Sequence, residues 1–304
     1  MEVLRTADEI RDVNTRYHDV AASGYDSKWG IDFGEVGQAQ VVGKLRKVLG
    51  PALDRGFDRS LEVGAGTGYF SLNLLRAGVV GAATCTDISP GMVRALNANA
   101  RRLRLAVNTA RADAESLPFA EESFDLVLGH AVLHHLPDLE GAFSEFHRVL
   151  RPGGWVVFAG EPSRFGDRLA ALPKRGANAV APLWRRALRA GPPPPPNGNG
   201  SPGWDDHDLE PEVDIHSFAP GDLAKLARAA GFTDISVRGE ELLANWFGWF
   251  NRALEASADP DDVPMLWRQY AFHGYLLLQR LDQRLLEPRL PPAIFYNLLL
   301  AARA

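Results

Sequence analysis

The chain has 304 residues, of which 46% are hydrophobic and 23% are charged, and its formal net charge is −5. These values are typical of a globular protein with a sizeable core, and without a dominant block of like charge they give no support for binding nucleic acid. The single cysteine, Cys85, excludes an internal disulfide and an all-cysteine metal site. The N-terminus lacks a signal-peptide core, and no apolar run reaches the roughly 18 residues of a membrane span, so we expect a cytoplasmic protein.

Strand-like and helix-like stretches alternate between residues 58 and 162. Short apolar runs bounded by turn residues predict strands at 59–66, 82–89, 105–113, 124–131 and 154–162. Apolar residues at helical spacing predict helices at 69–78, 90–102 and 139–154, the last closed by a Pro152-Gly153-Gly154 stop signal. This alternation predicts an α/β fold with a parallel sheet, whose ligand sits at the carboxyl ends of the strands.

The remainder of the chain is less regular. By composition it divides into a basic, Pro-rich and acidic insertion, a core helix and strand, a helical aromatic cap insertion and the last core strand, at 163–213, 214–245, 246–291 and 292–304. The basic stretch of the first insertion either pairs with its acidic run or is a solvated face.

A glycine-rich turn, LEVGAGTGYF, follows the first predicted strand. A dinucleotide-binding turn needs a third small residue where Tyr69 stands, and Glu62 before the first glycine would repel a pyrophosphate. These two residues disfavour a nicotinamide-dependent oxidoreductase. A carboxylate at this place instead suits a ligand that carries a cationic amine.

Four motifs between Leu61 and about Phe158 resemble, in order and spacing, those of the class I S-adenosylmethionine-dependent methyltransferases, in particular their small-molecule, type 11-like branch. The motifs are LEVGAGTG, TDISPGMVRAL, ADAESLPFAEESFDLVLGHAVLHHL and FSEFHRVLRPGGWVVF. The resemblance implies a Rossmann-like three-layer α/β/α fold with a mostly parallel seven-stranded sheet and helical cap insertions. It also implies S-adenosyl-L-methionine as the cofactor and S-adenosyl-L-homocysteine as its product, with residues 58–162 as the cofactor-binding core.

The resemblance also implies which residues contact the cofactor. They are Tyr25, Glu62, Gly64, Ala65, Gly66, Gly68, Asp87, Ile88, Asp113, Ala114, Gly129 and His130. Asp87 is expected to accept hydrogen bonds from both ribose hydroxyls, Asp113 and Ala114 to meet the adenine, and the carbonyl of Gly129 or His130 to hold the ammonium. Asp87 and Asp113 have an alternative reading as residues that cap turns.

The N-terminal segment, residues 1–57, resembles the family's leading helical lid. Tyr17, Tyr25 and Trp29 are aromatic residues that could face a sulfonium, and Tyr25 is the preferred contact. The alternative is that these aromatic residues pack a surface helix on the core.

Three residues are candidates for activating an acceptor. His135 is the first candidate for a general base, followed by His134, and Glu161 after the fifth strand is a base or a substrate anchor. The alternative for the histidine pair is that it shapes the turn, because LHHL occurs in family members with different acceptors. No convincing carboxylate set for a metal is found.

We therefore predict an enzyme that transfers a methyl group to a small, apolar or aromatic acceptor at a hydroxyl oxygen, by in-line displacement. The alternatives are methylation of nitrogen, of carbon or of a macromolecule, and a noncatalytic cofactor-binding or scaffold protein. Methylation of amino groups of DNA bases is disfavoured, because GHAVL stands where an Asn-Pro-Pro-Tyr motif would be. The oligomeric state is left open.

Overall fold

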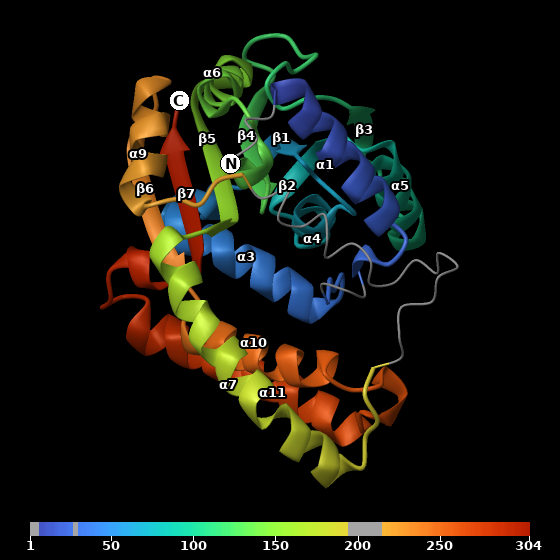
Figure 1. Cartoon of the computed structure of the whole chain (residues 1–304). Coiled ribbons are helices and arrows are strands. Elements are labelled where there is room, and N and C mark those ends of the chain that lie inside the picture. Colours follow the sequence, from blue (N-terminus) through green and yellow to red (C-terminus); the bar gives the residue numbers. More distant parts are fainter. Residues whose placement is uncertain (1–5, 27–29, 194–214) are drawn as a thin grey trace. The chain divides into compact units, whose positions relative to one another are not determined.

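Seven strands form one sheet in the order β3-β2-β1-β4-β5-β7-β6 (Figure 1). They are β1 Phe57–Val63, β2 Val80–Asp87, β3 Asn108–Arg111, β4 Phe124–His130, β5 Leu150–Pro162, β6 Thr233–Glu240 and β7 Asn297–Arg303. The pairs β1–β2, β2–β3, β1–β4 and β4–β5 are all parallel. The chain runs outward from β1 to β3 and then returns to β4 on the other side of β1. This topology confirms the predicted mostly parallel, Rossmann-like sheet and places its switch point between β1 and β4.

This computed structural model describes residues 6–26, 30–193 and 215–304. By its internal contacts the chain divides into two compact units. The first comprises Met1–Glu161, Pro202–Val237 and Leu299–Ala304, and the second Pro162–Ser201 and Arg238–Leu298. Trp29, the acidic run of the first insertion and nearly all of its Pro-rich run lie outside the described residues.

The core of the first unit lies on both faces of the central strands. Leu61 and Val63 of β1 and Leu128 of β4 are completely buried. Continuous apolar strands of this kind are expected where helices cover both faces of a parallel sheet. The helices of this unit are α1 Ala7–Ala21, α3 Glu35–Leu49, α4 Tyr69–Arg76, α5 Pro90–Leu103, α6 Leu139–Val149 and α9 Pro220–Ala229.

Local sequence explains where these helices begin. Thr6 and Glu9 form a capping box at the start of α1. The side chain of Ser89 accepts from the N–H of Met92 ahead of α5, and that of Asp138 accepts from the N–H of Gly141 ahead of α6. α6 ends at Val149, and the Pro-Gly-Gly stop signal lies inside β5 instead of in the helix, because a residue that precedes proline disfavours helical backbone.

The second unit is built from three long helices, α7 Arg164–Leu188, α10 Leu243–Ala256 and α11 Met265–Leu281, and α10 packs against both others. The helical pattern predicted for the aromatic insertion agrees with α10 and α11. The continuous helix α7 was not predicted, and Pro173 and Pro182 lie inside it. No helix in the described part of the chain is both long and apolar enough to cross a bilayer.

Candidate active site

The glycine turn after β1 has two distinct requirements for glycine. Gly64 and Gly66 both have positive φ angles, 57° and 52°. A Cβ on Gly64 would lie 2.3 Å from the side chain of Val132, whereas one on Gly66 would meet only the Tyr25 ring, at 4.0 Å. Gly64 therefore allows close packing against the turn after β4, and Gly66 leaves an open backbone face toward Tyr25.

Asp87, the last residue of β2, links this turn to the start of α5. Its carboxylate accepts from the N–H of Gly66 at 2.8 Å and from the N–H of Ser89 at 2.9 Å, one bond to each oxygen. Each oxygen keeps a lone pair for a further donor. Burial raises the pKa of Asp87, while the nearby His18 and the two N–H donors act in the opposite direction. The turn-capping role and a ligand role are thus compatible at this residue.

Several of the predicted contacts lie behind the turn. Glu62 is buried and accepts from the N–H of Ser71 at 2.8 Å, and burial raises its pKa to about 7. The N–H of Ala65 donates to the carbonyl of Thr86, and Gly68 begins α4 in a left-handed conformation. A Cβ on Gly129 would clash with the Phe158 ring at 2.7 Å. None of these residues lines the cavity described next.

A cavity of about 80 Å³ lies at the switch point, among residues of the first unit only. The predicted site residues that line it are Tyr25, Gly64, Gly66, Asp87, Ile88, Asp113, Ala114, His130 and His135. An open hollow of about 410 Å³ adjoins it and shares Arg11, Ile88, Ala112 and Asp113. The structure thus brings together most of the residues that the sequence places at different strand ends.

Helix α1 supplies cavity residues that the sequence analysis missed. Arg11, Asn14 and His18 line the cavity, whereas Tyr17 is buried in the core. The Thr6–Glu9 capping box signals a helix here, but a helix signal does not tell which face meets the ligand. His18 holds its Nδ1 against the carbonyl of Asn14 at 2.9 Å, which directs Nε2 away from α1's own backbone.

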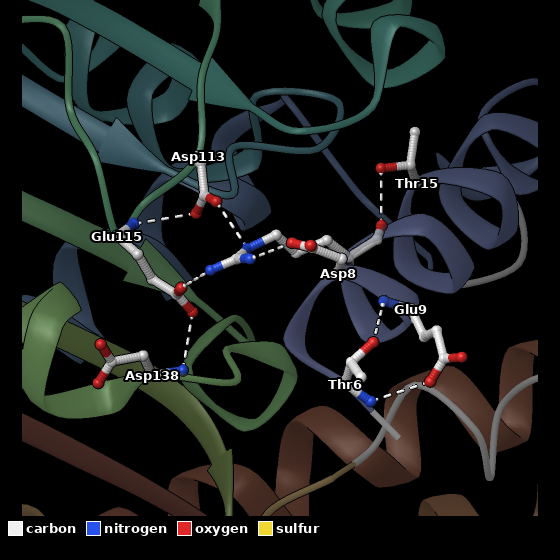
Figure 2. A network of polar contacts seen from close by, with 8 residues as sticks. Thr6, Asp8, Glu9, Thr15, Asp113, Glu115 and Asp138 are labelled. Carbon is white, nitrogen blue, oxygen red and sulfur yellow. Dashed lines mark hydrogen bonds and ion pairs between the residues drawn. The ribbon is translucent and has the colours of Figure 1, made fainter.

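Arg11 ties α1 to the loop after β3, and Glu115 extends this network to the loop after β4. Its guanidinium pairs with Asp113 at 2.8 Å, with Asp8 at 2.9 Å and with Glu115. Glu115 also accepts from the N–H of Asp138, which caps α6. Figure 2 shows Asp8, Asp113 and Glu115 turned toward this one cation. The network joins α1, the loop after β3 and the loop after β4.

The three candidate bases occupy different environments. Glu161 is completely buried and accepts from the backbone N–H groups of Val132, Leu133 and His134, and from Nδ1 of His134 at 2.8 Å. Burial alone would raise the pKa of Glu161, but His134 and the backbone donors outweigh it and lower this pKa. This carboxylate therefore holds the turn after β4 in place through its hydrogen bonds.

His134 and His135 are neighbours in sequence but differ in exposure to the cavity. His134 is buried against Glu161 and does not line the cavity. His135 lines it. The centroid of its ring is 3.9 Å from that of His134 and 5.4 Å from that of His18. Within the described residues, no group of three His, Cys, Asp or Glu side chains is placed to hold a metal ion.

Comparison with known proteins agrees with this geometry. A family described as "Methyltransferase domain" matches residues 61–158. A malonyl-(acyl-carrier protein) O-methyltransferase from Methylococcus capsulatus is 38% identical over 163 residues, 53% of this chain and 54% of that protein. The chain spans about half or less of the length of this and two further relatives of that name.

Solved structures support the fold. Phosphoethanolamine N-methyltransferase 2 of Haemonchus contortus, in complex with S-adenosyl-L-methionine, has a TM-score of 0.57 at 19% identity. The match covers 99% of this chain and 60% of that chain. The (4+2)-cyclase SpnF has a TM-score of 0.56 at 18% identity, and the match covers 95% of this chain and 94% of that chain. At these identities the likeness shows the fold alone.

A demethylmenaquinone methyltransferase from Roseiflexus sp. is 32% identical over 180 residues, which are 59% of this chain and 70% of that protein. Such identity over most of a relative, with the glycine turn, the strand-end carboxylate and the cavity at the switch point, shows that the chain belongs to the class I S-adenosylmethionine-dependent methyltransferases.

Proposed function

We propose that this chain transfers the methyl group of S-adenosyl-L-methionine to an oxygen of a small, apolar or aromatic acceptor. The observation that carries the proposal is the position of His135, the only one of the three candidate bases that lines the cavity. A histidine side chain is suited to remove a proton from a hydroxyl at neutral pH.

The residues present fit the cofactor. The two oxygens of Asp87 each have capacity for one ribose hydroxyl beyond their backbone donors. The open face of Gly66 allows the ligand to approach the backbone, and Ile88, Asp113 and Ala114 form a partly apolar wall for the adenine. The cavity of about 80 Å³ is continuous in its lining with the open hollow of about 410 Å³, so a ligand of the cofactor's size would extend from one into the other.

When bound, the cofactor supplies an electrophilic methyl group on a sulfonium. The protein's own task is to hold the acceptor oxygen in line and to take its proton. Glu161 and His134 would keep the turn that carries His135 in place, through the buried hydrogen bonds described above. Glu161 thus acts in this proposal as a positioning residue.

The names of the relatives favour two acceptor classes. One relative is named for O-methylation of malonyl-(acyl-carrier protein), a carboxyl acceptor, and another for methylation of demethylmenaquinone, a quinone whose methylated atom the name does not state. A carboxylate acceptor carries no proton to remove, whereas a phenol or other hydroxyl does. Dependence on a base therefore distinguishes a carboxyl acceptor from a hydroxyl acceptor.

The test is the His135→Gln variant, assayed for S-adenosyl-L-homocysteine release with hydroxylated naphthoquinones and with malonyl-(acyl-carrier protein). We expect turnover with the hydroxyl acceptor to fall about 100-fold, with cofactor affinity changed less than about twofold. His147→Gln, a histidine in contact with Phe232 away from the cavity, is the control. Unchanged turnover of the hydroxyl acceptor would remove His135 as the base, and cofactor binding without turnover of any acceptor would favour the noncatalytic alternative.

A further inference from the structure

Helix α7 of the second unit has an exposed apolar stripe. Phe165, Leu172, Val180 and Leu183 are 49%, 55%, 40% and 71% exposed. The spacings of 7 and 11 residues from Phe165 to Leu172 and from Leu172 to Leu183 are close to two and three helical turns, so these side chains share one side of the helix. The buried side, with Ala170, Ala177 and Ala181, is a different one.

A row of cations runs beside this stripe. Arg168, Arg175 and Arg186 each follow one of the apolar residues by three positions, and all three are exposed. Among the described residues, none of the three forms an ion pair with an acidic side chain. Two other basic residues of α7 contact α10 or the residue after it. Lys174 lies 4.0 Å over the Trp249 ring, and Arg185 donates to the carbonyl of Ser257.

The C-terminal end of α7 meets the N-terminal end of α11. The rings of Trp184 and Trp267 are 5.1 Å apart at this junction. Leu183 precedes Trp184, and Met265 and Leu266 precede Trp267. These are the three most exposed large apolar side chains of the described residues, Leu183 at 71%, Leu266 at 77% and Met265 at 68%. The C-terminal end of the α7 stripe therefore lies at a junction where the start of α11 also has exposed apolar side chains.

We propose that α7 docks this protein on the surface of an anionic lipid membrane, with the apolar stripe inserted among the acyl chains and the arginines at the phosphate level. Helices that lie in a membrane interface combine these two features, and each basic residue near an anionic surface adds to binding. The helix segment 164–188 has six basic residues and one acid, although the whole chain has a net charge of −5.

The shape of the stripe favours a membrane over an acidic protein. From Phe165 to Leu183 it extends about 27 Å along a helix, at 1.5 Å per residue. A row of side chains along one side of a helix can meet a planar surface. No residue of α7 lines the cavity of the first unit, and the inference does not depend on the identity of the acceptor.

The experiment is flotation of the purified full chain with vesicles of phosphatidylcholine alone and of phosphatidylcholine with about 30% phosphatidylglycerol, an anionic lipid. We expect roughly tenfold more protein on the anionic vesicles, and less at high salt, because screening weakens the arginine contribution. One variant replaces Phe165, Leu172 and Leu183 by serine, and a second replaces Arg168, Arg175 and Arg186 by glutamine. Each is expected to lower binding at least about tenfold.

The matched control replaces Arg101, Arg104 and Arg228, exposed arginines of the first unit, by glutamine, which removes the same charge elsewhere. Circular dichroism and cofactor titration check that each variant is folded. Equal binding to both vesicle types, or equal loss in the control, would overturn the proposal. Binding of a purified acyl carrier protein through α7 without binding to vesicles would assign the surface to an acidic protein instead.

Discussion

Both units contain buried carboxylates, but these stabilise different structures. In the first unit, Asp87 and Glu161 accept hydrogen bonds from the backbone of turns at the carboxyl ends of strands. In the second unit, Asp282 accepts from the N–H groups of Leu243 and Ala244 at the start of α10, and Glu241 accepts from Tyr275 and Gln279 of α11. One set shapes a ligand cavity, and the other holds helices together.

This difference shows that a buried acid is not by itself a functional site. Its chemistry depends on whether the backbone that it holds lines a cavity. We therefore expect substitutions in the first unit to change the cofactor site or the stability of its turns, and substitutions in the second unit to leave cofactor binding alone.

The largest expected effect is that of Glu161→Ala. It leaves three backbone N–H groups and the His134 side chain without their buried acceptor, so the free energy of unfolding should fall by about 3–5 kcal/mol. Denaturant titration at pH 7 measures this, with the exposed Glu140→Ala as control. If the free energy of unfolding falls by less than about 1 kcal/mol, the hydrogen bonds of Glu161 contribute little to stability.

Glu62 predicts a pH dependence of stability. Burial raises its pKa from an ordinary 4.5 to about 7, so the folded state holds this proton more tightly than the unfolded state. The contribution of the Glu62 proton to the free energy of unfolding is complete below pH 4.5. It is lost as the pH rises to about 7, a change of about 3 kcal/mol. In Glu62→Gln this contribution to the pH profile of the unfolding free energy should be absent. Parallel profiles for the two proteins would contradict the prediction.

Asp87→Asn tests the cofactor contact. Replacing a charged acceptor by an amide should weaken S-adenosyl-L-methionine binding about 100-fold, since hydrogen bonds to charged groups contribute about 1.5–3 kcal/mol each. Calorimetric titration measures the affinity, and Asp58→Asn, an exposed acid on β1, serves as control. Unchanged affinity would leave Asp87 with its turn-capping role only.

Arg11→Met removes the cation that joins α1 to Asp113 and Glu115 (Figure 2). We expect the backbone amides of α1 to exchange hydrogen about tenfold faster, because a partly buried, three-carboxylate pairing contributes on the order of 1–2 kcal/mol. Mass spectrometry of hydrogen exchange measures this. Arg16→Met, an exposed arginine of the same helix, should have little effect, and equal acceleration in both variants would remove the special role of Arg11.

The smallest effect on the cofactor is expected in the second unit. Asp282→Ala removes the acceptor at the start of α10 and should destabilise the protein by about 1–2 kcal/mol. The affinity for S-adenosyl-L-methionine should change less than about twofold. A tenfold loss of this affinity would contradict the expectation that substitutions in the second unit leave cofactor binding unchanged.

The sequence by itself determined the sheet and the glycine turn. Strand and helix periodicities, cap residues and the need for positive φ at Gly64 and Gly66 are properties of neighbouring residues. Alternation of strands with helices predicts parallel pairing, and the carboxyl ends of parallel strands meet at one edge. For this reason Asp87, Asp113 and His135 could be predicted to lie near one cavity.

Only the tertiary structure decided which residues near that edge reach the cavity. It separated His135 from His134 and placed Glu161 behind the turn as a buried acceptor. It also brought Arg11 and His18 of α1 to the cavity, and it showed α7 as one continuous helix despite two internal prolines. The physical reason is that side-chain environment depends on contacts between residues far apart in the chain, and local patterns do not encode which face of an element those contacts cover.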